Sequence, residues 1–201
     1  MIEKVKLGIW DYFVYLMVGG AAFLLIVVHC TLKGSLTIEQ IEKTPSGVAV
    51  LLLLFLFLLL GMLIEPVANL VFKIVTRWND LGFKKWDDEI EKLEQEAKLY
   101  VPKGVWAEMI FLFAKNWVLN NGDPSEFNAF LSKYGFYRSI AFLFFLNTFV
   151  SLALYWGWIG GIVGIINILF ARLYAYRSSV FYRHMSLTIY SQFIHGHAEV
   201  K

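Results

Sequence analysis

Four long apolar stretches run along the chain, separated by segments rich in polar residues. The stretches cover residues 12–30, 44–66, 139–156 and 158–176. Each has close to the roughly 20 apolar residues that a helix needs to cross a bilayer. The pattern therefore predicts four transmembrane helices, the second of which can continue to residue 76. Only Gly157 and its neighbours separate the last two helices, which predicts a tight antiparallel hairpin.

Composition supports the same class of protein. Hydrophobic residues make up 58% of the 201 residues and charged residues 17%, whereas a soluble domain has about 45–50% and about 25%. A soluble chain of this size could not bury so much apolar surface. The sequence therefore predicts an all-α integral membrane protein.

The distribution of Lys and Arg predicts its orientation. Of the 18 such residues, the loop between the first two spans holds two, and the other 16 lie before the first span, between spans two and three, or from Arg172 onward. Because basic residues are enriched on the cytoplasmic side, we expect a multi-pass protein of the cell inner membrane with both termini in the cytoplasm. The expected parts are a first transmembrane pair (1–76), a helical cytoplasmic insert (77–135), a transmembrane hairpin (136–176) and a cytoplasmic helix and tail (177–201).

The insert contains a helix that is hard to place from sequence alone. Trp86–Tyr100 has the pattern of a surface helix, but Val105–Asn120 is apolar almost all round. It is too short to span a bilayer, so partners must bury it or it must lie along the membrane surface. After it, Asp123 can cap a third helix that has Pro124 at its first position.

Glu65 is the first candidate for a functional role, because it ends the longest apolar run and precedes Pro66. If the helix continues to Phe72, Glu65 lies inside the membrane, about 12 Å from the level of Lys73 at 1.5 Å per residue. Ionisable groups in a span are usually paired or face water. Arg172 lies at a similar depth, so we expect Glu65 and Arg172 to form an ion pair or to line a pore. The alternative is that the bilayer ends at Glu65 and an interfacial helix follows.

Small and polar residues define one face of the fourth span. They are Gly160, Gly164, Asn167 and Ala171. Small residues let helix backbones approach, and asparagine can form a hydrogen bond across the contact. The face predicts a helix contact, either within the chain or between subunits.

Three arginines next to the expected cytoplasmic ends of the spans form the third candidate site. Arg138, Arg177 and Arg183 can bind anionic lipid headgroups or a partner. The spacing of Arg177 and His184 resembles the short signature of RNA-cleaving HEPN domains. However, it follows a span directly, and a nucleic-acid partner is not expected.

The sequence contains no motif that identifies an enzymatic reaction. The chain has no Walker loop, no Gly-x-Ser-x-Gly and no His-Glu-x-x-His. Its histidines do not have metal-ligand spacing. We therefore expect no enzymatic activity, no metal and no cofactor.

The layout of four spans, a helical insert and the stretch LSKYGFYR (131–138) leading into the hairpin resembles small multi-spanning inner-membrane proteins of bacterial antiphage defence cassettes. The resemblance implies self-assembly in the membrane and membrane disturbance when a partner signals infection. The expected function is thus a homo-oligomeric membrane-perturbing or channel-type effector in defence against phage. The alternative is a non-conducting membrane scaffold that recruits a cytoplasmic partner protein through residues 77–135, with the apolar helix as its docking surface.

Overall fold

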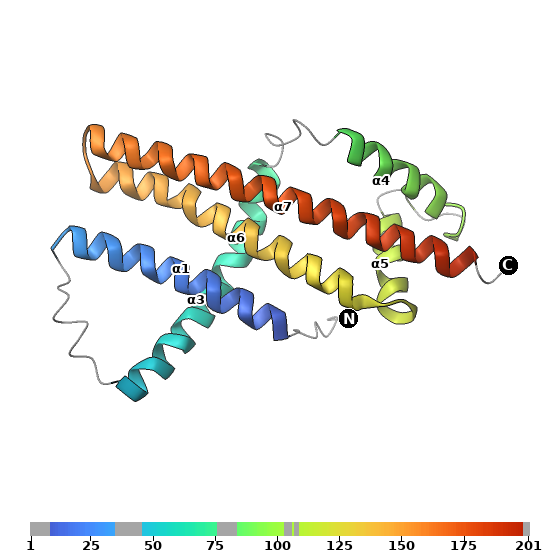
Figure 1. Cartoon of the computed structure of the whole chain (residues 1–201), viewed down its shortest axis with the longest axis horizontal. Helices are drawn as coiled ribbons and strands as arrows, with labels where there is room; N and C mark the ends of the chain where they lie inside the picture. Colours follow the sequence, from blue (N-terminus) through green and yellow to red (C-terminus); the bar gives the residue numbers. More distant parts are fainter. Residues whose placement is uncertain (1–8, 35–45, 76–83, 103–105, 107–108, 199–201) are drawn as a thin grey trace. The chain divides into compact units, whose positions relative to one another are not determined.

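The computed structural model describes residues 9–34, 46–75, 84–102, 106 and 109–198. Within these ranges all regular structure is helical, which confirms the predicted all-α class. The helices are α1 (Ile9–Leu32), α3 (Ser46–Val75), α4 (Lys84–Ala97), α5 (Ile110–Asn121), α6 (Pro124–Leu154) and α7 (Trp158–Ala198) (Figure 1).

Four of these helices, α1, α3, α6 and α7, are long and apolar enough to cross a membrane. This agrees with the four predicted spans and indicates a membrane protein. The candidate span in α3 covers Val50–Val71 and so includes Glu65. Pro66 lies inside α3 without ending it. α6 ends at Leu154 and α7 begins at Trp158, so the turn is as short as predicted; Gly157 in this turn has φ +101°, a conformation that only glycine adopts readily.

The chain divides into two compact units. Unit 1 comprises Met1–Val75 and Gly135–Ala175, and unit 2 comprises Thr76–Tyr134 and Tyr176–Lys201. Helices α6 and α7 contribute residues to both units.

In unit 1, two glycines let α1 and α3 cross closely (Figure 1). A Cβ atom on Gly19 would collide with the backbone of Phe57, and one on Gly61 would collide with the backbone of Tyr15. Residues 15 and 19 thus meet residues 61 and 57 in reverse order, so the two helices are antiparallel. Glycine is required at both positions because any side chain would push the backbones apart.

The small-residue face of α7 lies against α6 of the same chain. A Cβ atom on Gly164 would be 3.5 Å from a methyl carbon of Leu152 and 3.6 Å from that of Thr148, and one on Gly160 would meet the backbone at Tyr155. Asn167 is 5% exposed, and Ala171 is partly buried. Of the two contacts that the sequence left open, the structure shows the one within the chain.

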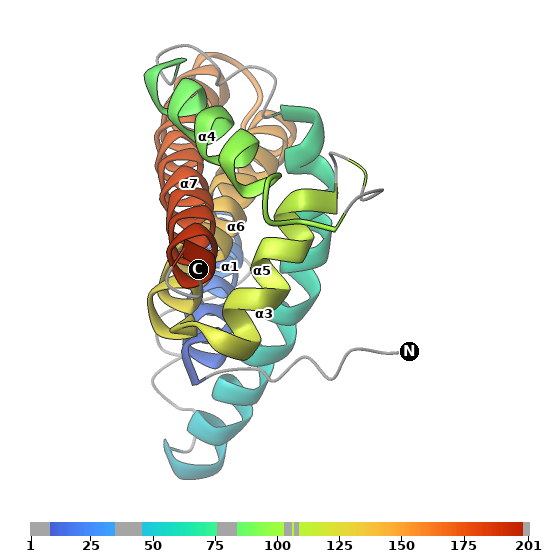
Figure 2. The same cartoon turned by 90° about the vertical axis from the view of Figure 1, so that its right-hand side faces the viewer.

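Unit 2 has its own apolar core, to which α4, α5, α6 and α7 all contribute (Figure 2). Ala97 of α4 is buried there, and Ile90 and Leu93 of the same helix pack against it. The apolar face of α5 also packs there, with Ile110, Ala114 and Val118 at most 2% exposed. The chain itself therefore buries one face of this helix, while Leu112 and Leu119 on it are 41% and 42% exposed. The structure begins this helix at Ile110, and residues 105, 107 and 108 of the predicted helix lie outside the described residues.

The predicted start of α6 is confirmed. Its first residue is Pro124, and the backbone N–H of Ser125 donates a hydrogen bond to Asp123 Oδ1 at 2.9 Å. The hydrogen bonds from Ser125 lower the pKa of the Asp123 carboxyl, because they stabilise its charged form. Asp123 therefore fixes where the chain turns from α5 into α6.

Candidate functional site

A charged cluster lies in unit 1, where α1, α3 and α6 meet. Arg138 donates hydrogen bonds to Glu65 Oε1 and to Asn69 Oδ1, each at 3.1 Å. The hydroxyl of Tyr15 donates to the other carboxylate oxygen of Glu65, also at 3.1 Å. We call these four residues, Tyr15, Glu65, Asn69 and Arg138, the charged cluster. Both oxygens of Glu65 are engaged within it.

The partner of Glu65 differs from the sequence prediction. Arg138 forms the ion pair, and Arg172 is exposed. Both arginines lie near the same ends of their spans, so depth alone could not distinguish them. The choice depends on which face of each helix turns toward α3, and α6 presents Arg138 there.

The ion pair is unevenly buried. The side chain of Arg138 is 6% exposed, and that of Glu65 is 35% exposed. A buried charge is tolerated only when its partner and hydrogen bonds are in place. Arg138 therefore depends on Glu65 more than Glu65 depends on Arg138.

A second polar cluster joins α1, α6 and α7. His29 Nε2 lies 2.7 Å from Asn147 Oδ1, and His29 Nδ1 lies 3.0 Å from the hydroxyl of Tyr155. Asn147 Nδ2 donates to Asn167 Oδ1 at 3.1 Å, and Asn167 Nδ2 donates to Ser151 Oγ at 3.5 Å. We call His29, Asn147, Ser151, Tyr155 and Asn167 the histidine cluster. Both asparagines are at most 8% exposed and Ser151 is 0% exposed, so buried polar groups here satisfy one another.

An apolar layer separates the two clusters. It consists of Val18 and Ala22 on α1 and Ile140 and Leu143 on α6, which are between 1% and 7% exposed. These residues lie between the clusters along both helices. At 1.5 Å per residue, the α6 residues of the two clusters, Arg138 and Asn147, are about 14 Å apart.

Two of the three arginines expected at headgroups have protein partners instead. Arg138 belongs to the charged cluster. In unit 2, Arg183 donates to both oxygens of Asp87, at 2.7 and 3.1 Å, and its side chain is 10% exposed. These two arginines are held inside the protein and do not form the predicted lipid or partner contact. Arg177 is exposed and remains available for one.

The spacing of Arg177 and His184 does not produce a shared site. The ring of His184 stacks on Phe130, with centroids 5.5 Å apart, and meets the ring of Trp86 edge-on at 4.6 Å. These aromatic contacts link α7 to α4 and α6 within unit 2. His184 therefore has a packing role, while Arg177 is exposed.

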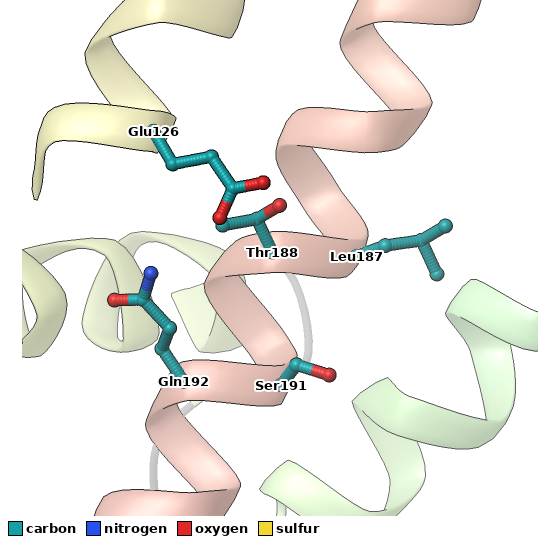
Figure 3. Close-up of a pocket in the computed structure, with 5 residues that line it drawn as sticks. All are labelled: Glu126, Leu187, Thr188, Ser191 and Gln192. Atoms are coloured by element: carbon teal, nitrogen blue, oxygen red, sulfur yellow. The ribbon is translucent and has the colours of Figure 1, made fainter. Parts of the chain in front are cut away.

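Unit 2 also has a shallow pocket of about 230 Å³, lined by Glu126, Leu187, Thr188, Ser191 and Gln192. Figure 3 shows the carboxylate of Glu126 on α6 beside Thr188 on α7, while Ser191 points away from both. The polar groups do not converge on one point, so the pocket does not define a ligand. In the described part of the chain, no group of three or more His, Cys, Asp and Glu side chains could hold a metal ion.

Sequence reasoning missed several contributors to these clusters, among them Tyr15, His29 and Tyr155. His29 carried a usable signal, because it is a histidine within the long apolar stretch of the first span. The two tyrosines carried none, since tyrosine is common near the ends of membrane spans.

Comparisons of the chain with protein-family models, with curated proteins and with solved structures give no match, so its kinship to antiphage membrane proteins stays a prediction.

Proposed function

We propose that the chain is a channel-type membrane effector, in which ions pass through the helical bundle of unit 1 when its apolar layer opens. The observation that supports this is the pair of polar clusters inside candidate membrane spans, one on each side of that layer. Ionisable residues inside spans are costly and commonly mark ion pathways. Hydrophobic constrictions between polar regions gate channels by excluding water.

In this proposal the described packing is the closed state. Val18 and Leu143 in the apolar layer are 1% and 6% exposed, so water has no continuous path between the clusters. Glu65 binds both Arg138 and Tyr15 and so is not free to attract a cation. Opening must separate the layer and release part of the charged cluster.

The cellular setting is a further part of the proposal. The lopsided distribution of Lys and Arg supports an inner-membrane location with cytoplasmic termini. Self-association and a role in defence against phage are supported by the resemblance of the layout alone. The scaffold alternative rests on the part of α5 that the core of unit 2 leaves uncovered, since Ile110, Ala114 and Val118 are buried there and Leu112 and Leu119 are exposed.

Ion flux from proteoliposomes tests the proposal. The full chain is reconstituted into vesicles loaded with KCl. The rate of K⁺ release is then compared between the wild-type protein and the variant Leu143→Asn. A polar side chain in the apolar layer admits water, so flux should rise severalfold over that of the wild-type protein. The matched control is Leu146→Asn, on the same helix but 47% exposed, which should leave flux unchanged.

Two outcomes would contradict the proposal. If Leu143→Asn is helical and monodisperse but releases no more K⁺ than empty vesicles, the apolar layer is not a gate. If both variants leak equally, the flux reflects a general disturbance of the protein and not a path through its interior.

A further inference from the structure

His29 connects three helices through hydrogen bonds at both ring nitrogens. It lies in the last turn of α1, and its partners are Asn147 on α6 and Tyr155 in the turn that follows α6. Asn147 passes the connection on to Asn167 of α7. His29 thus links α1 to the α6–α7 hairpin. It lies on the opposite side of the apolar layer from the charged cluster.

The directions of the hydrogen bonds define the protonation state of this arrangement. Asn147 uses its NH₂ group to donate to Asn167, so its oxygen accepts from His29 Nε2. In a neutral imidazole that carries its proton on Nε2, Nδ1 is an acceptor. The hydroxyl of Tyr155 then donates to Nδ1, and every group of the cluster is matched.

A second proton on His29 reverses one of these hydrogen bonds and adds a positive charge. Nδ1 then becomes a donor, so the Tyr155 hydroxyl must turn to accept. The other cluster members are neutral, and none is a carboxylate that could balance the positive charge. Among the described residues at this end of α1, the ionisable neighbours are Cys30, the next residue, and Lys33, just after α1, whose ammonium lies 5.7 Å from the centre of the Tyr155 ring and is itself positive. α7 contributes the neutral Asn167.

We propose that His29 is a proton-binding site, and that binding of the second proton loosens α1 from the α6–α7 hairpin. The ligand is a proton, and the reaction is reversible protonation of Nδ1 with no other bond made or broken. A charge inside a helical bundle is stabilised by water, so the protonated ring favours a state in which it reaches water. The loosened state binds one proton more than the packed state, so falling pH favours it.

The first test reads the ring directly in the wild-type protein. The full chain, with ¹⁵N-labelled histidine, is reconstituted in bilayers, and the imidazole nitrogens are followed by NMR from pH 8 to pH 5. The signals of the three unit 2 histidines are assigned with His184→Gln, His195→Gln and His197→Gln. We expect His29 to carry its proton on Nε2 at pH 8 and on both nitrogens at the acidic end. A proton on Nδ1 alone at pH 8, or no change down to pH 5, overturns the proposal.

The second test reads the motion of α1 through Cys30, the single cysteine of the chain, which is partly buried. Its rate of reaction with a maleimide is compared between the wild-type protein and His29→Gln. Glutamine can donate to Asn147 and accept from Tyr155 but cannot be protonated, so it keeps the packed state at every pH. Dividing the two rates cancels the ionisation of the thiol itself.

As the pH falls from 8 to 5, this ratio should rise by up to about tenfold per pH unit, as expected for one linked proton. His195→Gln, which changes an exposed histidine of unit 2, should follow the wild-type profile. A ratio that stays constant from pH 8 to pH 5 refutes the loosening of α1. Neither test measures ion flow, so the result is independent of the proposed channel function.

Discussion

The ion pair between Glu65 and Arg138 gives a quantitative prediction, because its two members are unequally buried. Glu65→Gln removes the charge that balances Arg138, whose side chain is 6% exposed. Leaving a buried charge without its partner costs about 3–5 kcal/mol. Arg138→Gln leaves Glu65, which is 35% exposed and still accepts a hydrogen bond from Tyr15. The expected loss of unfolding free energy for this variant is smaller, about 1–3 kcal/mol.

The double variant measures the interaction itself. When both Glu65→Gln and Arg138→Gln are present, no charge is left without its partner, so the loss should be smaller than the sum of the two single losses. We expect a coupling energy of about 1–3 kcal/mol. Arg172→Gln is the matched control, because Arg172 is exposed, and its effect should stay within about 0.5 kcal/mol.

The assay is unfolding of the full chain in mixed micelles by titration with sodium dodecyl sulfate, followed by far-UV circular dichroism and tryptophan fluorescence. Two results would refute the reasoning. Additive losses for Glu65→Gln and Arg138→Gln would show that the pair is not coupled. A loss for Arg172→Gln as large as that for Arg138→Gln would return Arg172 to the role that the sequence suggested.

Three further predictions follow from the packing. Gly19→Ala should lower the stability of unit 1 by about 1–3 kcal/mol, because the new Cβ meets the α3 backbone. In the control Gly20→Ala, the new Cβ meets only ring carbons at 3.5 Å or more, so the unfolding midpoint should change little. Equal effects of the two substitutions would contradict the close crossing of α1 and α3. Arg183→Gln should increase hydrogen exchange in α4, because Asp87 on that helix loses both of its hydrogen bonds to Arg183. Arg177→Gln, at an exposed position, should leave the exchange unchanged. Unchanged exchange in both variants would show that the Arg183–Asp87 ion pair does not stabilise α4. Asp123→Ala should lower the thermal midpoint at pH 6. The pKa of this carboxyl is lowered from 3.8, so the stability that its charge provides is complete above pH 3.8 and is lost as pH falls through the folded-state pKa. The difference in thermal midpoint between Asp123→Ala and the wild-type protein should therefore shrink toward pH 3. A difference that stays constant with pH would argue against the charged cap.

The apolar helix in the insert shows how far sequence reasoning reached. The pattern of residues 105–120 predicted an apolar helix that needs cover, and the structure has a helix over Ile110–Asn121 with one face buried. The pattern could not say whether lipid, a partner or the chain itself provides that cover. The answer depends on residues far away in the sequence, since Met185, Ile189 and Phe193 of α7 belong to the same core.

The glycines of α1 and α7 show the same limit. The small residues of α7 predicted a close helix contact but not its partner. Gly164 faces Leu152 of α6, and Gly19 of α1 faces Phe57 of α3. Small residues indicate that a contact exists but do not identify the helix that makes it.

The sequence by itself determined the features that depend on neighbouring residues. The length of each apolar run predicts four spans, the residues around Gly157 predict the hairpin turn, and Asp123 with Pro124 predicts the start of α6. Only the tertiary structure decided that Arg138 and not Arg172 binds Glu65, and that His29 joins the buried asparagines of α6 and α7. The physical reason is that a membrane span is apolar toward lipid and toward other helices alike, so its hydrophobic pattern does not reveal which face meets a neighbour. That choice depends on how the helices cross, and it decides which polar side chains come within hydrogen-bonding distance.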